Sequence, residues 1–284
     1  MSNPHRRALV LLALCGVFWS TAGVLIKLVD WNVAAIWGAR SLIAAVALWG
    51  VRRPSWKGIS RYEWMAAFAL AATTGLFILA NKLTTAANAI LIQYSAPIWV
   101  ALLGQWFLGE KATRLDWITI AAVLLGISLF FMDQLTFDHA AGNLVAVAAG
   151  VAFAANAMCL RKVALSGTAE MPGDPLRPLL LGNVIGAVCG APFFFVGHAP
   201  GLTAWGALLA LGVVQQAAAY LCYAAGIRHA TALEGILIPV IEPILSPIWV
   251  ALAIGERPGP WALVGGVVVI GAVTARASVG RRRR

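Results

Sequence analysis

The sequence predicts an all-α integral membrane protein, with ten transmembrane helices arranged as two inverted five-helix repeats. Hydrophobic residues make up 61% of the 284 residues and charged residues 11%, whereas soluble domains carry roughly a quarter charged residues. Ten apolar segments approach the length of about 20 residues that a helix needs to cross a bilayer. Two of these segments, in different halves of the chain, share one sequence motif.

The ten predicted spans follow one another with short connections. The longest connection, from Ala164 to Arg177, contains two glycines and two prolines, and no connection is long enough to hold a soluble domain. We therefore expect two repeats, residues 1–135 and residues 136–284. The spans are expected near residues 8–28, 33–51, 63–81, 86–107, 115–132, 143–163, 178–197, 203–225, 232–253 and 260–277.

The first span follows Arg6 and Arg7, as the apolar part of a secretory signal peptide would. No small-residue cleavage site precedes Lys27, and nine further spans follow, so we expect this segment to be retained as a helix.

The basic residues predict the orientation. With the N-terminus in the cytoplasm, every Lys and Arg lies on the cytoplasmic side, except Lys27, Lys82 and Arg257 on the outer side and Arg40 within the second span. This asymmetry is typical of a membrane protein with both termini in the cytoplasm. The short loops are compatible with a bacterial inner membrane.

The fourth and ninth spans carry the shared motif. Ala-Ile-Leu-Ile at 89–92 matches Gly-Ile-Leu-Ile at 235–238, Pro97 matches Pro243, and Gly-Glu-Lys at 109–111 matches Gly-Glu-Arg at 255–257, all at one offset of 146 residues. Because five is an odd number of spans, the second repeat must enter the membrane inverted. Inverted repeats with interrupted helices are typical of transporters that open alternately to either side. The alternative is a duplicated membrane protein whose prolines are only packing kinks.

Together these features resemble the drug/metabolite transporter superfamily and, within it, the EamA-type exporters. The resemblance rests on the five-plus-five duplication, the proline-containing fourth and ninth spans with their Gly-Glu-Lys or Gly-Glu-Arg ends, and Phe18-Trp19-Ser20 in the first span. It covers nearly the whole chain. It implies a ten-helix fold and export of small metabolites, with amino acids, drugs, sugars and nucleotide-linked compounds all carried within the family. The branch that exports aromatic amino acids is one candidate.

Prolines are expected to break the helices of the fourth and ninth spans. Pro239, Pro243 and Pro247 are four residues apart, and each lacks the N–H that would bond a carbonyl one turn earlier. Pro97 has the corresponding place in the fourth span. The carbonyl groups freed in this way need water, a side chain or a ligand.

Two charged residues lie deep within predicted spans. Glu242, among the prolines, would bind a substrate ammonium or take up a proton, since intramembrane acids are functional by default. In the alternative it is protonated, or paired with Arg40, and only holds the bundle together. Arg40 would bind a substrate carboxylate, or pair with Glu242 or a helix end. Glu234, nearer the cytoplasmic end, could serve the site or simply be solvated.

Polar and aromatic side chains form stripes on several spans. Gln216, Tyr220 and Tyr223 share one helical face, with Gln215 expected to point elsewhere. The alternative role for such groups is hydrogen bonding between helices, worth about 0.6–2 kcal/mol per contact, and for a deep tryptophan it is packing. The full set of candidate substrate contacts is Trp19, Thr74, Phe77, Asn81, Asn88, Gln93, Tyr94, Trp99, Phe153, Asn156, Gln216, Tyr220, Tyr223, Glu242 and Ser246.

These groups predict a secondary transporter that exports small amphipathic metabolites by alternating access. Amides, tyrosines, one deep acid and one deep base suit a zwitterion with an apolar body, so an amino acid, above all a large or aromatic one, is the expected substrate. The alternative within the same fold is a drug or nucleotide-linked metabolite carrier. A phosphate would need several cations in the cavity, and only Arg40 is deep.

Other function classes fit less well. An intramembrane enzyme would need a nucleophile with a base or a metal cluster, and the sequence has no His-Glu-x-x-His, Gly-x-Ser-x-Gly or CxxC spacing. No ATP-binding motif is present, so direct ATP coupling is not expected. Neither a metal nor a cofactor is expected. The basic residues do not form a nucleic-acid stripe. A passive channel suits inverted repeats less well than a carrier. The expected partners are a small-molecule substrate and the lipid bilayer, and a monomer is compatible with the sequence.

Overall fold

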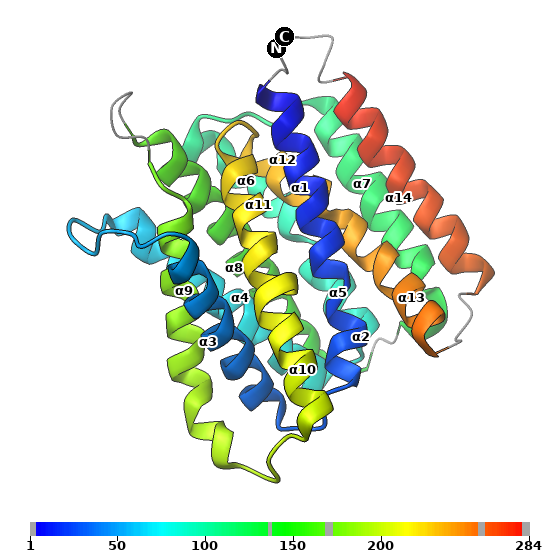
Figure 1. The fold of residues 1–284 in the computed structure, drawn as a ribbon. Helices are drawn as coiled ribbons and strands as arrows, with labels where there is room; N and C mark the ends of the chain where they lie inside the picture. The colour runs from blue at the N-terminus through cyan, green and yellow to red at the C-terminus, as the bar shows by residue number, and fades with distance from the viewer. Residues whose placement is uncertain (1–3, 136–137, 168–172, 255–258, 280–284) are drawn as a thin grey trace.

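The computed structural model describes residues 4–135, 138–167, 173–254 and 259–279, and every regular element in them is a helix (Figure 1). Eight helical segments are long and apolar enough to cross a membrane, which confirms the all-α membrane architecture. They coincide with every predicted span except the fifth and ninth. The fifth corresponds to a helix of 17 residues, and the ninth is interrupted. Ten spans, and the division after residue 135, therefore stay predictions.

The helices follow the predicted spans in order, and several spans consist of two or three elements. The elements are α1 (Pro4–Ser20), α2 (Ala22–Lys27), α3 (Val33–Val51), α4 (Arg61–Leu83), α5 (Ala86–Gln93), α6 (Ala96–Leu108), α7 (Arg114–Phe130), η1 (Met132–Gln134), α8 (Ala140–Leu165), α9 (Leu176–Gly190), η2 (Ala191–Phe195), α10 (Leu202–Ala210), η3 (Leu211–Ala218), α11 (Ala219–Ile227), α12 (Ala232–Leu237), η4 (Ile238–Val240), α13 (Ile241–Ile254) and α14 (Pro260–Val279).

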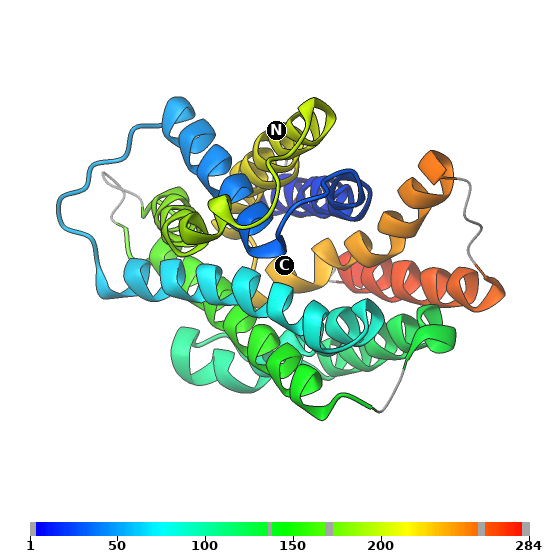
Figure 2. The same ribbon diagram turned by 90° about the horizontal axis from the view of Figure 1, so that it is seen from below.

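Long helices from different halves of the chain pack against each other. Helices α4 and α8 run side by side, as do α7 and α14 (Figures 1 and 2). The start of α1 and the end of α14 lie at the same end of the bundle (Figure 1). We call this the basic end, because the helix ends and connections there carry Arg7, Arg52, Arg161, Arg177, Arg228 and Arg276. The predicted outer residue Arg257, with Gly255 and Glu256, lies outside the described residues.

Three helices begin at the basic end with the same local motif. Ser60, Thr113 and Thr231 each accept a hydrogen bond from the backbone N–H three residues later, and the acid at that later position bonds back to the backbone N–H of the capping residue. Such capping boxes satisfy two N–H groups that have no partner within the helix. The acids are Glu63 in α4, Asp116 in α7 and Glu234 in α12.

The helix breaks in the fourth and ninth spans coincide with only some of the prolines. The fourth span breaks at Tyr94 and Ser95, and Pro97 lies in the first turn of α6, where a proline costs no intrahelical hydrogen bond. In the ninth span the break is at η4, which contains Pro239. Helix α13 continues through Pro243 and Pro247 to Ile254, so the prediction that these two prolines break the helix is wrong.

Each break is contacted by a glycine from the other half of the chain. A Cβ atom added at Gly16 of α1 would lie 2.9 Å from the Pro239 carbonyl oxygen. One added at Gly150 of α8 would lie 2.9 Å from the Gln93 carbonyl oxygen. Only glycine allows this close approach of the backbones. The first helix of each predicted repeat is thus packed against the interrupted helix of the other.

We predict that Gly16→Ala and Gly150→Ala each lower the unfolding temperature of the purified protein, since the added methyl group overpacks a backbone contact at a cost of about 1–3 kcal/mol. Gly206→Ala in α10 is the matched control, because a Cβ atom there meets nothing within 4 Å. Thermal unfolding in detergent, followed by tryptophan fluorescence, measures the difference. Equal unfolding temperatures for all three variants would contradict this account of the packing.

Candidate functional site

Four of the predicted substrate contacts form one aromatic cluster in the interior. The Trp19 ring stacks on Tyr223, with ring centroids 5.7 Å apart. It makes edge contacts with Phe153 at 6.1 Å and with Tyr220 at 6.3 Å. The four rings come from α1, α8 and α11. Both tyrosines are buried, whereas Trp19 and Phe153 are partly exposed.

The two interrupted spans meet through one hydrogen bond. The hydroxyl of Tyr94, at the break of the fourth span, donates to a carboxylate oxygen of Glu242, in the first turn of α13, at 3.0 Å. Glu242 therefore has a neutral partner from the other half of the chain. A direct ion pair with Arg40, the alternative considered from sequence, is not among the ion pairs of the described residues.

Arg40 is the buried cation of this region. Its side chain belongs to α3 and the residue is 8% exposed. Its Nε is buried without a hydrogen-bond partner in the described residues. Arg40 lies within electrostatic range of Tyr220 and Glu242. A buried guanidinium with an unused donor is costly unless an anion can reach it.

The eighth span departs from a regular α-helix. Residues Leu211–Ala218 form a π-helix, and such segments often occur at functional sites. Gln216 donates a hydrogen bond to Asn183 of α9 at 2.5 Å and also interacts with Tyr220. Tyr220 and Tyr223 both contact Trp19. Gln215, expected off this face, is also buried.

Several other predicted contacts are hydrogen-bonded in ways that fit the packing alternative. Asn156 donates to the Ala66 carbonyl, Asn88 to Asn143, and Asn81 to the Phe77 carbonyl in its own helix. Thr74 accepts from Trp37 at 2.9 Å. All but the Asn81 bond connect helices, and they use polar groups that a ligand would otherwise bond.

The remaining candidates lie near the interruptions. Trp99 donates to Ser95 at 3.3 Å, across the start of α6. Ser246 faces Gly23 of α2, where an added Cβ atom would lie 2.6 Å from the serine oxygen. Gln93 is partly exposed at the break of the fourth span. Sequence periodicity missed Asn183, the partner of Gln216, because it is an isolated polar residue on an apolar helix. Ser20, from the Phe18-Trp19-Ser20 run, accepts a hydrogen bond from Trp249 at 2.8 Å.

Two cavities lie outside this cluster. One, of about 960 Å³, is bounded by apolar residues of α1, η4, α13 and α14, with His5 and Arg6 at its rim. The other, of about 610 Å³, lies at the basic end between α1, α3, α9 and α11. None of the predicted substrate contacts lines either cavity. The role of these residues in substrate binding therefore stays a prediction.

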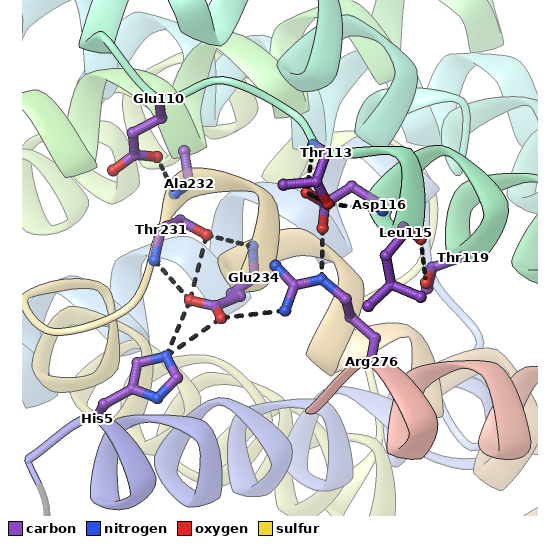
Figure 3. Close-up of polar contacts among 10 residues, drawn as sticks. All are labelled: His5, Glu110, Thr113, Leu115, Asp116, Thr119, Thr231, Ala232, Glu234 and Arg276. Carbon is purple, nitrogen blue, oxygen red and sulfur yellow. Dashed lines mark hydrogen bonds and ion pairs between the residues drawn. The ribbon is translucent and has the colours of Figure 1, made fainter. Parts of the chain in front are cut away.

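A network of charged groups ties helices together at the basic end (Figure 3). The Glu234 carboxylate lies between His5 of α1, at 3.1 Å, and Arg276 of α14, at 3.7 Å. Arg276 also forms an ion pair with Asp116 of α7. Glu234 is buried rather than solvated, and His5 lies in the first turn of α1. Four helices, α1, α7, α12 and α14, are joined by these contacts.

Glu110 extends the network beside α12. One of its carboxylate oxygens accepts the Ala232 N–H at 2.8 Å, at the start of the helix (Figure 3), where the helix dipole favours a negative charge. The other accepts from Arg161 of α8 at 2.8 Å. Arg161 in turn donates to the carbonyls of Ile227 and Arg228. These contacts therefore join the two halves of the chain at this end of the bundle.

We predict that Arg276→Gln destabilises the basic end, because it leaves Asp116 and Glu234 without their shared cation, and breaking a buried ion pair costs about 3–5 kcal/mol. Hydrogen–deuterium exchange of residues 231–237 should rise and the unfolding temperature should fall. Arg276→Lys should recover most of both losses.

Arg114→Gln is the matched control, since Arg114 is an exposed arginine at the same end. If Arg276→Gln exchanged no faster than this control, the network would not hold the basic end together.

Comparison with known proteins gives consistent matches over the chain. The model of the EamA-like transporter family matches residues 6–132 and 140–275. A probable terminal-alkyne amino-acid exporter of Streptantibioticus cattleyicolor is 27% identical over 308 aligned residues, covering 98% of this chain and 96% of that protein. An uncharacterized transporter of Archaeoglobus fulgidus is 24% identical over 203 residues, covering 71% of this chain and 70% of its own length.

A solved crystal structure shares the fold. It superposes with a TM-score of 0.80 at 18% identity, covering 96% of this chain and 98% of the other. At this identity the likeness concerns the arrangement of the helices alone.

Proposed function

Because this chain belongs to the EamA-like transporter family, we propose that it exports small amphipathic metabolites, above all amino acids with large or aromatic side chains. The family is one of transporters, so the protein is a membrane transporter and not an enzyme. The substrate class and the mechanism are the parts that we propose.

The observation that carries the proposal is the aromatic cluster beside one acid and one buried cation. A zwitterionic amino acid offers an ammonium group to Glu242 and a carboxylate to Arg40, whose Nε has no hydrogen-bond partner in the described residues. Charge-assisted hydrogen bonds of this kind are stronger than neutral ones. The Trp19, Tyr220 and Tyr223 rings supply an apolar surface for a large side chain.

The exporter of Streptantibioticus cattleyicolor supports the same substrate class. Its name concerns an amino acid with an apolar terminal alkyne, which combines a zwitterionic end with an apolar side chain. Drugs or nucleotide-linked metabolites are the alternative cargo. The nucleotide-linked compounds are less favoured, because their phosphates would need several cations in the cavity and Arg40 is the buried arginine of the described residues.

Alternating access is the transport mechanism that we propose. Residues 1–135 and 136–284 would form inverted repeats, and the two separate matches of the family model are compatible with this division. Each repeat would contribute an interrupted helix, and the two helices meet at the Tyr94–Glu242 hydrogen bond. Substrate uptake from the basic end requires the contacts of Glu234, Arg276 and Glu110 to open, while release requires the opposite end to open.

We also propose that the basic end faces the cytoplasm of a bacterial cell, with the protein in the inner membrane. The charge asymmetry of the connections supports this orientation. It makes the ion pairs at the basic end the cytoplasmic closure of the transport path.

The direct test is uptake of labelled phenylalanine, tryptophan, threonine and a sugar into proteoliposomes that contain the purified protein. The proposal expects saturable uptake of the aromatic amino acids and none of the sugar. Saturable uptake of none of the amino acids would contradict the substrate class and leave the family assignment intact.

Variants of the charged pair test the binding mode. We predict that Arg40→Gln and Glu242→Gln each raise the KM for phenylalanine at least about tenfold, since a hydrogen bond to a charged group contributes roughly 1.5–3 kcal/mol. Asp133→Asn, which changes an exposed acid, is the control and should leave the KM unchanged.

A matched pair of tryptophans tests the aromatic surface. We predict that Trp19→Leu weakens phenylalanine uptake more than threonine uptake, because the stacking surface serves the large side chain. Trp106→Leu is the control, since Trp106 is 82% exposed on the outer face of α6. Equal losses for both amino acids would show that Trp19 only packs the bundle.

A further inference from the structure

The cavity of about 610 Å³ at the basic end has two chemically different parts. Its lining residues come from α1, α3, α9, α11 and the connections next to them. One part is cationic, with Arg7, Arg52 and Arg228 beside His229. The other part is apolar and continues along the helices, with Leu11, Val51, Leu221 and Ala225.

The cationic part carries more positive charge than its acid can neutralise. Asp174 is the one acid that lines the cavity, and it bridges Arg228 at 3.1 Å and Arg52 at 3.5 Å. Three arginines and one carboxylate leave a surplus of positive charge within the described lining. The Nε of Arg228 is buried and has no hydrogen-bond partner in the described residues.

The backbone at Arg228 is fixed by a separate contact. Arg161 of α8 donates hydrogen bonds to the carbonyls of Ile227 and Arg228, at 3.0 and 2.8 Å. Arg52 and Arg7 are exposed, so their guanidinium groups can turn toward a ligand. The site thus combines one arginine with a fixed backbone and two exposed arginines whose side chains can reorient. Guanidinium groups are well suited to bind phosphate oxygens.

The apolar part of the lining comes from helices long enough to cross a membrane. Val51 is 66% exposed at the end of α3, and Leu11 and Leu221 lie on α1 and α11 below the arginines. A ligand that fills both parts needs a phosphate at one end and a hydrocarbon chain at the other. Basic pockets between transmembrane helices on the cytoplasmic side bind lipid headgroups for this reason.

We propose that this cavity binds an anionic phospholipid, with its phosphate held by Arg7, Arg52 and Arg228 and an acyl chain lying along α1 and α11. These two helices carry Trp19, Tyr220 and Tyr223, so a lipid bound there braces the helices that form the aromatic cluster. The inference depends on the chain lying in a bilayer and not on the identity of the transported substrate.

Native mass spectrometry of the full-length protein, titrated with phosphatidylglycerol or phosphatidylcholine, tests the proposal. We expect phosphatidylglycerol to stay bound to the wild-type protein, and the double variant Arg7→Gln with Arg52→Gln to bind it about tenfold more weakly, since each basic residue near the surface contributes to anionic lipid binding. Equal retention of both lipids by the wild-type protein would overturn the proposal.

The matched control is the double variant Arg6→Gln with Arg53→Gln. These arginines are the sequence neighbours of the first pair, remove the same charge and do not line the cavity. Equal weakening by both double variants would mean diffuse attraction to the basic end, and it would overturn the assignment of a site.

Two further arms separate the lipid from a soluble anion and do not depend on variants. Inorganic phosphate or glycerol 3-phosphate that displaced phosphatidylglycerol at low millimolar concentration would overturn the lipid assignment in favour of a soluble phosphate ligand. Phosphatidylglycerol with a photoreactive acyl chain should label α1 and α11. Labelling confined to other helices would overturn the placement.

Discussion

Three acids at the basic end each stabilise both the start of a helix and a contact between helices. Glu63, Asp116 and Glu234 complete capping boxes at the starts of α4, α7 and α12, and each also pairs with a cation from a distant helix, Arg177 or Arg276. The local hydrogen bonds fix each carboxylate, so the ion pairs lose little side-chain entropy when they form. In a bundle whose outer surface is apolar, helices gain little from hydrophobic association in lipid, and these directional contacts determine which helix ends meet.

At the helix starts the backbone hydrogen bonds are satisfied, whereas in the centre of the bundle the regular helical hydrogen bonding is locally lost. The fourth and ninth spans are interrupted, the eighth contains a π-helix, and the polar interior lies at these positions. Irregular backbone at membrane depth is tolerated where it is buried in protein or lines a polar cavity. Gly16 and Gly150 bring an intact helix against each interruption, and Tyr94 with Glu242 connects the two. Ion pairs at the basic end and interrupted helices in the centre are compatible with the alternating mechanism that we propose.

Much of the fold follows from sequence, because apolar length and charge asymmetry are strong signals, and the eight apolar helices lie where hydropathy predicts them. The motif shared by the fourth and ninth spans indicates where helices break, although α13 continues through Pro247. Partners across helices could not be predicted: Trp37 with Thr74, Asn183 with Gln216 and His5 with Glu234 are far apart in sequence. Periodicity assigns a residue to a face but does not identify the helix opposite.

The central claim is that this protein carries an amino acid through alternating exposure of one interior site. Counterflow measures it directly: proteoliposomes are loaded with unlabelled phenylalanine, diluted, and supplied with a trace of labelled phenylalanine outside. A carrier exchanges the two, so we expect the label to accumulate transiently above its external concentration and then to decline. A channel only equilibrates the label. Equilibration without an overshoot, in liposomes that take up phenylalanine, would contradict the account.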